Sequence, residues 1–341
     1  MSKIRIPWED PPANGEMIDI ADGVRWLRLP LPMRLDHVNI YVLDDGDGWT
    51  LIDTGMKWGK VENIWQSVLD GPLKGKPVTR VMSTHHHPDH IGFNGWFMER
   101  GAELYSTRTA YLMGRMLTLD VQDTYNEGQI DFYRRAGMRY DLLDARKEDR
   151  PFNFGDIVAP IPLGFNRLQE GQELTMAGRR WVVRIGHGHA PSHATFWTLD
   201  DNLVLSGDQI IPAISSNIGV YPTEPDANPL ADWMASCERF LPIATEDQLI
   251  LPGHKSPFTG APLRLKQLLE NHHGALDRLR AALKTPKTAG DVLEPVFKRK
   301  IGDGEYGLAL VEALAHCNYL WHAGEATRTL SKDGAYLWQI T

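Results

Sequence analysis

The chain of 341 residues is poor in cysteine and has no long hydrophobic run. Its two cysteines, Cys237 and Cys317, lie far apart and form no CxxC pair. This excludes a disulfide framework and a cysteine-based zinc ribbon. A transmembrane helix is not expected either, because no stretch of about 18 consecutive apolar residues occurs.

The beginning of the sequence lacks the features of a secretory signal. Its first twelve residues contain Glu9, Asp10 and several prolines where a signal peptide has its apolar core. We therefore expect a cytoplasmic protein.

The chain also has fewer basic than acidic residues. The chain has 36 Lys and Arg residues against 44 Asp and Glu residues, a formal net charge of −8. Nucleic acids and anionic membranes are bound through basic surfaces, so neither partner is expected here. With 42% hydrophobic residues, the composition is that of a globular protein long enough for a large domain and a small one. One residue type stands out, since the chain has thirteen histidines.

The first half of the chain alternates β-rich runs with polar turns. Runs at 24–29, 38–43 and 49–52, with an Asp-Gly turn at 44–48, predict an antiparallel meander. Apolar residues at helical spacing from Trp58 to Leu69 then predict a helix. Helices are thus expected to pack against the sheet. Further strands are predicted at 78–83, 181–185, 195–199, 203–205 and 248–251.

Two other segments have a helical character. Residues 109–150 are rich in Met and Tyr and are predicted to be an insertion, either an apolar lid over the site or amphipathic helices packed on the sandwich. After residue 262, helices at 263–283 and 306–323 and a hairpin with its tip at 332–334 predict a small winged-helix-like domain. We therefore expect a catalytic domain at 1–262 and a C-terminal domain at 263–341.

The strongest motif is the sequence THHHPDH at residues 84–90, directly after a predicted strand. Within it, His85, His87, Asp89 and His90 bring three imidazoles and a carboxylate into six residues, which is dense enough to hold metal if the loop turns sharply. The proline between them suits the first turn of a helix, which would turn the last two side chains toward a second position.

Three further candidate ligands follow other predicted strands. They are His189, Asp208 and His254, and each comes directly after a glycine. A glycine lets the backbone turn closely around a buried ion, because it has no Cβ atom. Taken together and in this order, the three residues predict that several strand ends meet at one metal site.

In this arrangement the chain closely resembles the metallo-β-lactamase superfamily over about residues 26–259. The resemblance implies an α/β (α+β) fold, a four-layer αββα sandwich, that holds one or two metals. It also implies that Asp208 bridges two metal ions. The first ion would be held by His85, His87 and His189, and the second by Asp89, His90 and His254. His86 fills the variable position of the HxHxDH motif and is not expected to be a ligand.

The ligand types indicate the chemistry. Nitrogen and oxygen ligands with a shared carboxylate suit two divalent ions about 3.5–4 Å apart, most plausibly Zn²⁺, although Fe and Mn also fit. Two such charges lower the pKa of a bridging water toward roughly 7, and the hydroxide would attack a carbonyl. We expect Asp89 to orient this hydroxide and take up its proton. Asp53 is either an outer carboxylate that fixes an imidazole tautomer or a helix N-cap. His193 either hydrogen-bonds within the site or is a core histidine.

The complete ligand set resembles that of glyoxalase II, related thioesterases and lactonases, so hydrolysis of a thioester or lactone in a small acyl substrate is predicted. Three alternatives remain: an endoribonuclease or phosphodiesterase of the same superfamily, a mononuclear-iron sulfur dioxygenase, and a nucleic-acid-binding regulator that uses the winged helix. Charge argues against a polyanionic partner, because residues 1–262 carry a net −10 and residues 263–341 only +2. The sequence predicts no substrate-binding residues and leaves homo-oligomerisation open.

Overall fold

The computed structural model describes residues 3–341; Met1 and Ser2, which belong to the predicted first domain, lie outside the described residues. The chain folds into two compact units. The first, here called the sandwich unit, contains the residues up to Val121, Asn153–Ser216 and Ile243–Arg264. The second, the helical unit, contains Gln122–Phe152, Asn217–Pro242 and Leu265–Thr341. The predicted insertion is thus divided between the two units. Segments of the two units alternate along the chain, whereas the sequence predicted a single boundary after residue 262.

Seven strands of the described chain form the first sheet of the sandwich unit, in the order β1 to β7. The strands β1 to β4 are an antiparallel meander, as predicted, and β4, β5 and β6 run parallel. The turn between β3 and β4 contains Gly46 at a φ of +84°, a conformation that suits glycine. The strands are β1 (Met17–Ala21), β2 (Val24–Pro30), β3 (His37–Asp44), β4 (Trp49–Ile52), β5 (Val78–Met82), β6 (Glu103–Ser106) and β7 (Asn166–Arg167).

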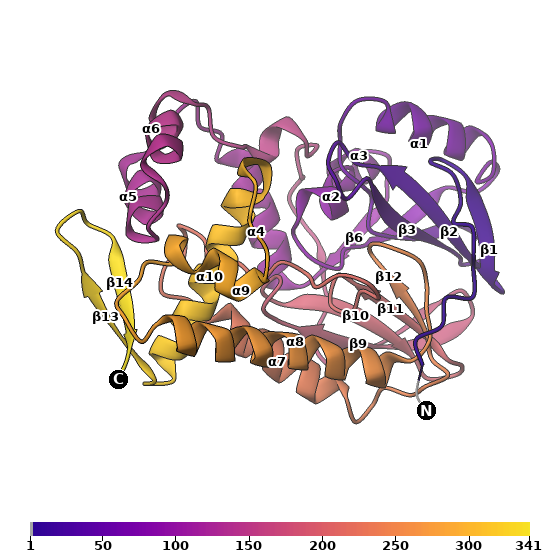
Figure 1. Cartoon of the computed structure of the whole chain (residues 1–341). Helices are drawn as coiled ribbons and strands as arrows, with labels where there is room; N and C mark the ends of the chain where they lie inside the picture. Colours follow the sequence, from indigo (N-terminus) through magenta and orange to yellow (C-terminus); the bar gives the residue numbers. More distant parts are fainter. Residues whose placement is uncertain (1–2) are drawn as a thin grey trace. The chain divides into compact units, whose positions relative to one another are not determined.

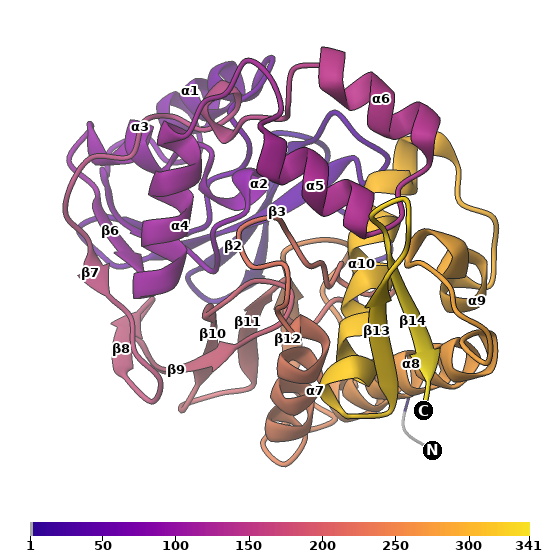
Figure 2. The same cartoon turned by 90° about the vertical axis from the view of Figure 1, so that its left-hand side faces the viewer.

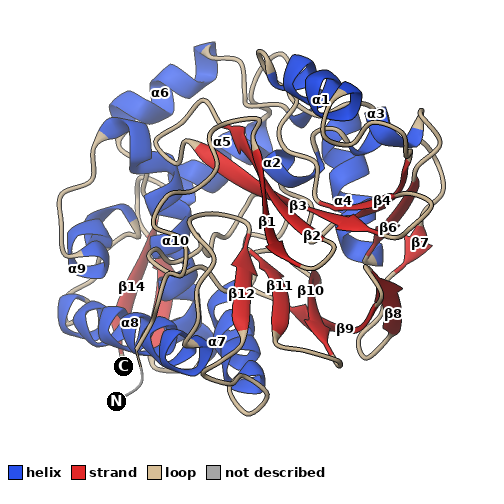
Figure 3. Cartoon of the chain, turned by 90° about the vertical axis from the view of Figure 1, so that its right-hand side faces the viewer, coloured by secondary structure: helices blue, strands red, loops and turns tan. Residues whose placement is uncertain are grey.

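The second sheet of the sandwich unit has the order β12-β11-β10-β9-β8 within the described residues. Its strands pair antiparallel except for β11 and β12, which are parallel. Figure 3 shows the strands of both sheets in red. The strands are β8 (Glu173–Met176), β9 (Arg179–Gly186), β10 (His193–Thr198), β11 (Leu203–Gly207) and β12 (Leu249–Pro252).

The alternation of side chains along the strands explains the layers. In β2 and β3, Trp26 pairs with Tyr41, and both side chains belong to the core that contains residues of the second sheet, such as Trp181. The next pair, Leu27 and Ile40, points to the opposite face and packs in a second core together with helix residues. Figure 1 shows the helices on this outer face, which are α1 (Val61–Asp70), α2 (Pro88–Ile91), α3 (Asn94–Met98) and α4 (Arg108–Leu119). A short 3₁₀ helix, η1, spans Phe154–Asp156.

The helical unit is built around α10, whose side chains are buried on several faces. The hairpin of β13 and β14 lies beside this helix (Figure 2). The predicted helices and the hairpin after residue 262 are therefore present, and their assignment as a winged helix stays a prediction. The elements are α5 (Glu127–Arg135), α6 (Tyr140–Glu148), α7 (Pro229–Phe240), α8 (Ala261–Ala282, whose first turn belongs to the sandwich unit), η2 (Gly290–Val292), α9 (Leu293–Phe297), α10 (Asp303–His322), β13 (Ala326–Leu330) and β14 (Tyr336–Ile340).

Several elements were not expected from the sequence. They include α3, α7 and the strands β1, β6, β7 and β8, of which β1, β7 and β8 lie at sheet edges. Edge strands are only partly buried, so their apolar pattern is weak. Across residues 3–341, no helix combines the length and apolar character that crossing a membrane requires.

A buried pair of histidines in the helical unit predicts a pH-dependent stability. His272 Nδ1 lies 3.3 Å from His316 Nε2, and His316 Nδ1 donates to the Glu312 carbonyl at 2.8 Å. Burial lowers the pKa of His272 to about 3 and that of His316 to about 4. Below about pH 6.5 the unfolded chain therefore binds more protons than the folded chain does. The free energy of unfolding falls as the pH falls from about 6.5 to 4.

Each histidine is expected to contribute up to about 2 kcal/mol to this fall between about pH 6.5 and 5, since one pKa unit corresponds to about 1.36 kcal/mol. Urea unfolding of the metal-free protein at both pH values measures the slope. The His272→Asn variant, whose amide keeps a polar atom near the Nδ1 position, should show a smaller slope than the wild type. An unchanged slope would contradict the assignment.

Candidate metal centre

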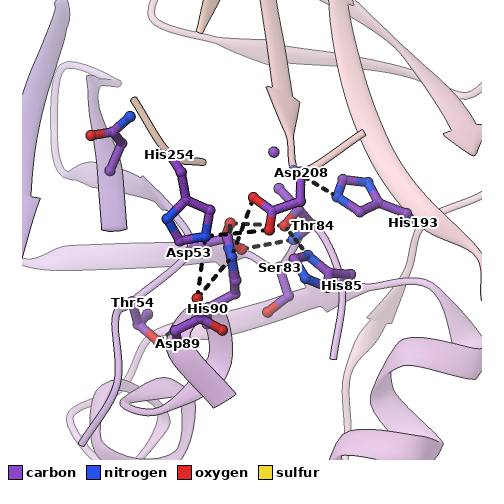
Figure 4. Close-up of polar contacts among 12 residues, drawn as sticks. Asp53, Thr54, Ser83, Thr84, His85, Asp89, His90, His193, Asp208 and His254 are labelled. Carbon is purple, nitrogen blue, oxygen red and sulfur yellow. Dashed lines mark hydrogen bonds and ion pairs between the residues drawn. The ribbon is translucent and has the colours of Figure 1, made fainter. Parts of the chain in front are cut away.

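The seven predicted ligands come together where strands of both sheets end. His85 and His87 follow β5 of the first sheet, whereas His189 follows β9 of the second. Asp208 directly follows β11, and His254 comes two residues after β12. Figure 4 shows how most of these side chains point toward one another from the two sheets. Residues far apart in the sequence thus form one buried cluster.

Three imidazoles form the first group of this cluster. Ligand atoms of His85, His87 and His189 all lie within 4.8 Å of one another. The ring centroid of His87 is 4.6 Å from that of His85 and 4.5 Å from that of His189. His85 Nε2 is buried and has no hydrogen-bond partner among the described residues. A buried ring nitrogen without such a partner costs free energy unless it binds an ion, so this group fits a metal.

A carboxylate and two imidazoles form the second group. Ligand atoms of Asp89, His90 and His254 also lie within 4.8 Å of one another. Asp89 Oδ2 is 3.3 Å from His254 Nε2 and 3.6 Å from His90 Nε2. The predicted change of direction within the HxHxDH motif is present, since α2 begins at Pro88 directly after His87. This helical turn brings Asp89 and His90 beside His254, while the His90 ring also stays 4.2 Å from that of His85.

The carboxylate of Asp208 lies between the two groups. Its Oδ2 is 3.4 Å from His189 Nε2 of the first group and 3.3 Å from His254 Nε2 of the second. Its Oδ1 is 3.5 Å from His90 Nε2. One carboxylate therefore faces ring nitrogens of both groups, which is the geometry expected of a bridging ligand.

The glycine before His254 is required by this packing. A Cβ atom on Gly253 would overlap Asp208 Oδ1 and would come within 2.8 Å of His90 Cε1. A Cβ on Gly207, which has a φ of +48°, would likewise lie only 2.6 Å from His193 Cε1. Only glycine allows the backbone to approach the cluster this closely.

The electrostatics of the cluster differ between its imidazole rings. Burial, reinforced by the neighbouring imidazoles, lowers the pKa of His85 and His87 well below its usual range. Burial also acts to lower the pKa of His254, but the Asp208 and Asp89 carboxylates outweigh it and raise that pKa to about 10. The pKa of Asp208 is held well below its usual range, because His254 and His90 outweigh the effect of burial. His85 and His87 are therefore neutral, whereas a metal ion would displace a proton from His254. Imidazole and carboxylate ligands of this kind suit Zn²⁺, Fe and Mn.

Asp53, directly after β4, is hydrogen-bonded to one of the ligands of the cluster. Its Oδ2 is 2.7 Å from His90 Nδ1, and it accepts hydrogen bonds from the Thr84 amide and hydroxyl, both at 2.8 Å. The alternative of a helix N-cap does not hold, because α1 begins only at Val61. Asp53 is thus the carboxylate that orients His90, and its φ of +62° shows that the backbone bends sharply there.

Thr84 was not expected from the sequence to have a role. Its hydroxyl donates to Asp53 and also lies 2.9 Å from His85 Nδ1, so its oxygen can accept a hydrogen bond from the Nδ1–H of His85. The Nε2 atom of His85 then remains for a metal. A threonine at a strand end is common, and no signal in the sequence distinguishes this one.

The Asp53→Asn variant tests the orientation of His90. An amide has one acceptor oxygen and cannot accept from His90 and from both Thr84 groups as the two oxygens of Asp53 do, so His90 should lose its fixed tautomer. We expect metal affinity to fall about 10–100-fold, the range found for outer hydrogen-bond partners of metal ligands. Competition with a chromogenic chelator measures this affinity, with the exposed Asp47→Asn as the matched control. Equal affinities in the two variants would contradict the role.

The remaining histidines near the motifs take other positions. His193 is fully buried, stacks on His85 with a centroid distance of 4.6 Å, and accepts a hydrogen bond from the Asp208 amide at 3.1 Å. It therefore supports the cluster rather than packing apart from it. His86 is buried and stacks against Phe154, and His187 Nδ1 accepts from the Ser192 amide. Neither His86 nor His187 belongs to the groups with converging ligand atoms.

Comparisons with known proteins agree with this geometry. A family model described as "Metallo-beta-lactamase superfamily" matches residues 33–254, and one described as "Metallo-beta-lactamase-like, C-terminal domain" matches residues 276–341. A curated relative, the "Probable metallo-hydrolase YqjP" of Bacillus subtilis (strain 168), is 25% identical over 88% of this chain and 92% of its own length.

Solved structures are similar over nearly the whole chain. A β-lactamase domain protein from Burkholderia ambifaria has a TM-score of 0.89 and 34% identity over 99% of this chain and 97% of its own. A metallo-β-lactamase family protein from Thermus thermophilus has a TM-score of 0.78 and 26% identity over 95% of this chain and 100% of its own. The predicted α/β fold, the αββα sandwich with a C-terminal domain, is therefore confirmed.

Proposed function

The chain belongs to the metallo-β-lactamase superfamily, and from this premise we propose that it is a metallohydrolase that holds two divalent ions, most suitably Zn²⁺, and cleaves a thioester or a lactone. The observation that supports two ions is the position of Asp208. Its two oxygens lie within 3.5 Å of ring nitrogens from both groups of the cluster. A site for a single ion would not need one carboxylate between two sets of three ligands.

The proposed ligands divide as the sequence predicts. Asp208 would bridge the two ions, His85, His87 and His189 would hold the first, and Asp89, His90 and His254 would hold the second. When bound, two such ions lower the pKa of a coordinated water toward roughly 7 and polarise the carbonyl under attack.

Asp89 is the residue that we propose moves the proton. Its side chain is 17% exposed, more than the 0–7% of its partners His90, His254 and Asp208, so it is accessible from outside the cluster. Burial acts to raise the pKa of Asp89, but His90 and His254 outweigh it and lower that pKa. The carboxylate is therefore ionised at neutral pH, and Asp89 Oδ2 can orient the attacking water and accept its proton.

The helix α4, part of the predicted lid, packs on the metal-binding motif. A Cβ atom on Gly114 of α4 would lie 3.8 Å from His86 Cβ, so α4 runs close to the motif. The helix also exposes apolar side chains at Leu112, Met116 and Leu119. At helical spacing these three lie on the side of α4 away from Gly114, so they face away from the motif. Tyr111 of the same helix is instead buried against Phe165, so only part of the predicted lid is open to solvent.

Metal quantification followed by a substrate screen tests the proposal. Purified protein should contain two divalent ions per chain and should hydrolyse members of a panel of acyl thioesters and lactones, with activity lost on chelation and restored by Zn²⁺. The same panel should include β-lactams and phosphodiesters. One iron per chain with oxygen-dependent turnover of a persulfide would contradict the proposed function in favour of a sulfur dioxygenase. Cleavage of phosphodiesters alone would contradict it in favour of a phosphodiesterase.

A further inference from the structure

We propose that Asn39 is a positioning residue that holds His254 in place for the second metal ion; this inference rests on the proposed function. Asn39 lies in the middle of β3, a strand in which almost every residue is buried, and is itself 1% exposed. A polar amide in such a strand must be hydrogen-bonded, since an unpartnered one is costly. The partners of Asn39 explain why it is there.

The turn that carries His254 requires support from outside itself. It spans residues 252–255 after β12, and its last residue, Lys255, has a φ of +67°. A left-handed conformation costs a non-glycine residue about 1–2 kcal/mol. The turn is also packed against Asp208, because Gly253 leaves no room for a Cβ atom. A strained turn in one defined position persists only when neighbouring groups hold it.

Asn39 of the first sheet supplies this support to the second sheet. Its side-chain Nδ2 donates to the carbonyls of Pro252 at 2.9 Å and Lys255 at 2.6 Å, and its backbone amide donates to the carbonyl of Gly253 at 2.7 Å. The Trp26 indole donates to Asn39 Oδ1 at 2.9 Å. An indole N–H can only donate, so the amide oxygen faces Trp26 and the amide nitrogen faces the turn.

His37, the preceding polar residue of β3, fixes the orientation of the His254 imidazole. His254 Nδ1 lies 2.7 Å from the His37 carbonyl, to which it donates, and the Lys255 amide donates to His37 Nε2 at 2.9 Å. With its Nδ1 proton fixed in this way, His254 presents Nε2 to Asp89 and Asp208, each 3.3 Å away. Asn39 fixes the position of the turn, and the His37 carbonyl fixes the tautomer of the ring.

This arrangement predicts an effect on one metal ion only. His254 belongs to the second group, whereas the histidines of the first group follow β5 and β9. Displacing the 252–255 turn should therefore weaken the second ion and leave the first one bound. A general loss of structure would weaken both.

The Asn39→Asp variant tests the proposal with little change of shape. The carboxylate keeps an acceptor for Trp26 but turns an oxygen toward the carbonyls of Pro252 and Lys255, where Asn39 donated. Stepwise Zn²⁺ and Co²⁺ titration of the metal-free protein against a competing chelator should show a first equivalent bound as in the wild type. The second equivalent should bind at least about tenfold more weakly, the lower end for an outer partner of a metal ligand. The exposed Asn63→Asp on α1 is the matched control for the added charge.

The outcomes separate this inference from the proposed function. Two equivalents bound with wild-type affinity in the Asn39→Asp variant, or an equal loss of both, would overturn the positioning role. If this variant does not fold, the Asn39→Ser variant removes the amide donors without adding charge. It should show the same selective weakening of the second metal ion. A wild-type protein that binds a single ion would instead contradict the proposed two-ion function.

Discussion

The Asp208→Ala variant is expected to bind fewer than two metal ions and to lose activity by more than about 100-fold, beyond the range for outer partners of metal ligands. Asp208 is the one cluster residue whose carboxylate faces ring nitrogens of both groups, at 3.3–3.5 Å. Removing it leaves His90 and His254 with a single carboxylate partner among the predicted ligands, Asp89. Metal content after dialysis and turnover on the best substrate of the panel measure both losses.

The control for this experiment is Asp47→Ala, which also removes a carboxylate but at an exposed turn of the sandwich unit. Circular dichroism of the metal-free proteins should be the same for both variants, because the loss concerns ligands rather than the core. Retention of two ions per chain and full turnover in Asp208→Ala would show that the ligand assignment is wrong.

The second large effect is expected when alanine replaces one or the other of two neighbouring histidines. His87→Ala should lose most of the metal of the first group and most activity, because its ring lies among those of His85 and His189. His86→Ala should keep both ions, because its ring packs against Phe154 and lies outside the groups of converging ligand atoms.

His86 is nevertheless only 6% exposed. Its replacement by alanine should therefore lower the free energy of unfolding by about 0.5–3 kcal/mol, the ordinary range for a single substitution. Metal content and urea unfolding, measured on both variants, separate the two effects. Equal losses of metal in the two variants would disprove the alternation of ligand and spacer in the HxHxDH motif.

Much of the sandwich unit was predictable because its strands have strong local patterns. The alternation of residues in β2 and β3, the Asp-Gly turn after β3 and the helical spacing in α1 each depend on neighbours within a few residues. The candidate ligands could be predicted for a related reason. Each follows an apolar run, and a glycine precedes His189, Asp208 and His254 because the backbone must approach the ion closely.

The parts that the sequence did not predict depend on residues that meet only in the folded chain. The insertion predicted at 109–150 is divided between the two units, since α4 packs on the metal-binding motif and α5 belongs to the helical unit. Thr84 and Asn39 looked ordinary, because their roles consist of hydrogen bonds to Asp53, to His85 and to a turn more than two hundred positions away.

The amino-acid sequence by itself determined the class of fold, the superfamily and the set of seven candidate ligands, because these depend on local patterns and short motifs. The resemblance to the superfamily implied how these ligands divide around Asp208, and only the tertiary structure decided which groups orient them. Asp53 could have capped a helix, and the structure instead puts it against His90. Asn39 of one sheet holds the turn of His254 at the end of the other. These choices depend on the packing of two sheets, which brings strand ends together at distances that no local pattern encodes.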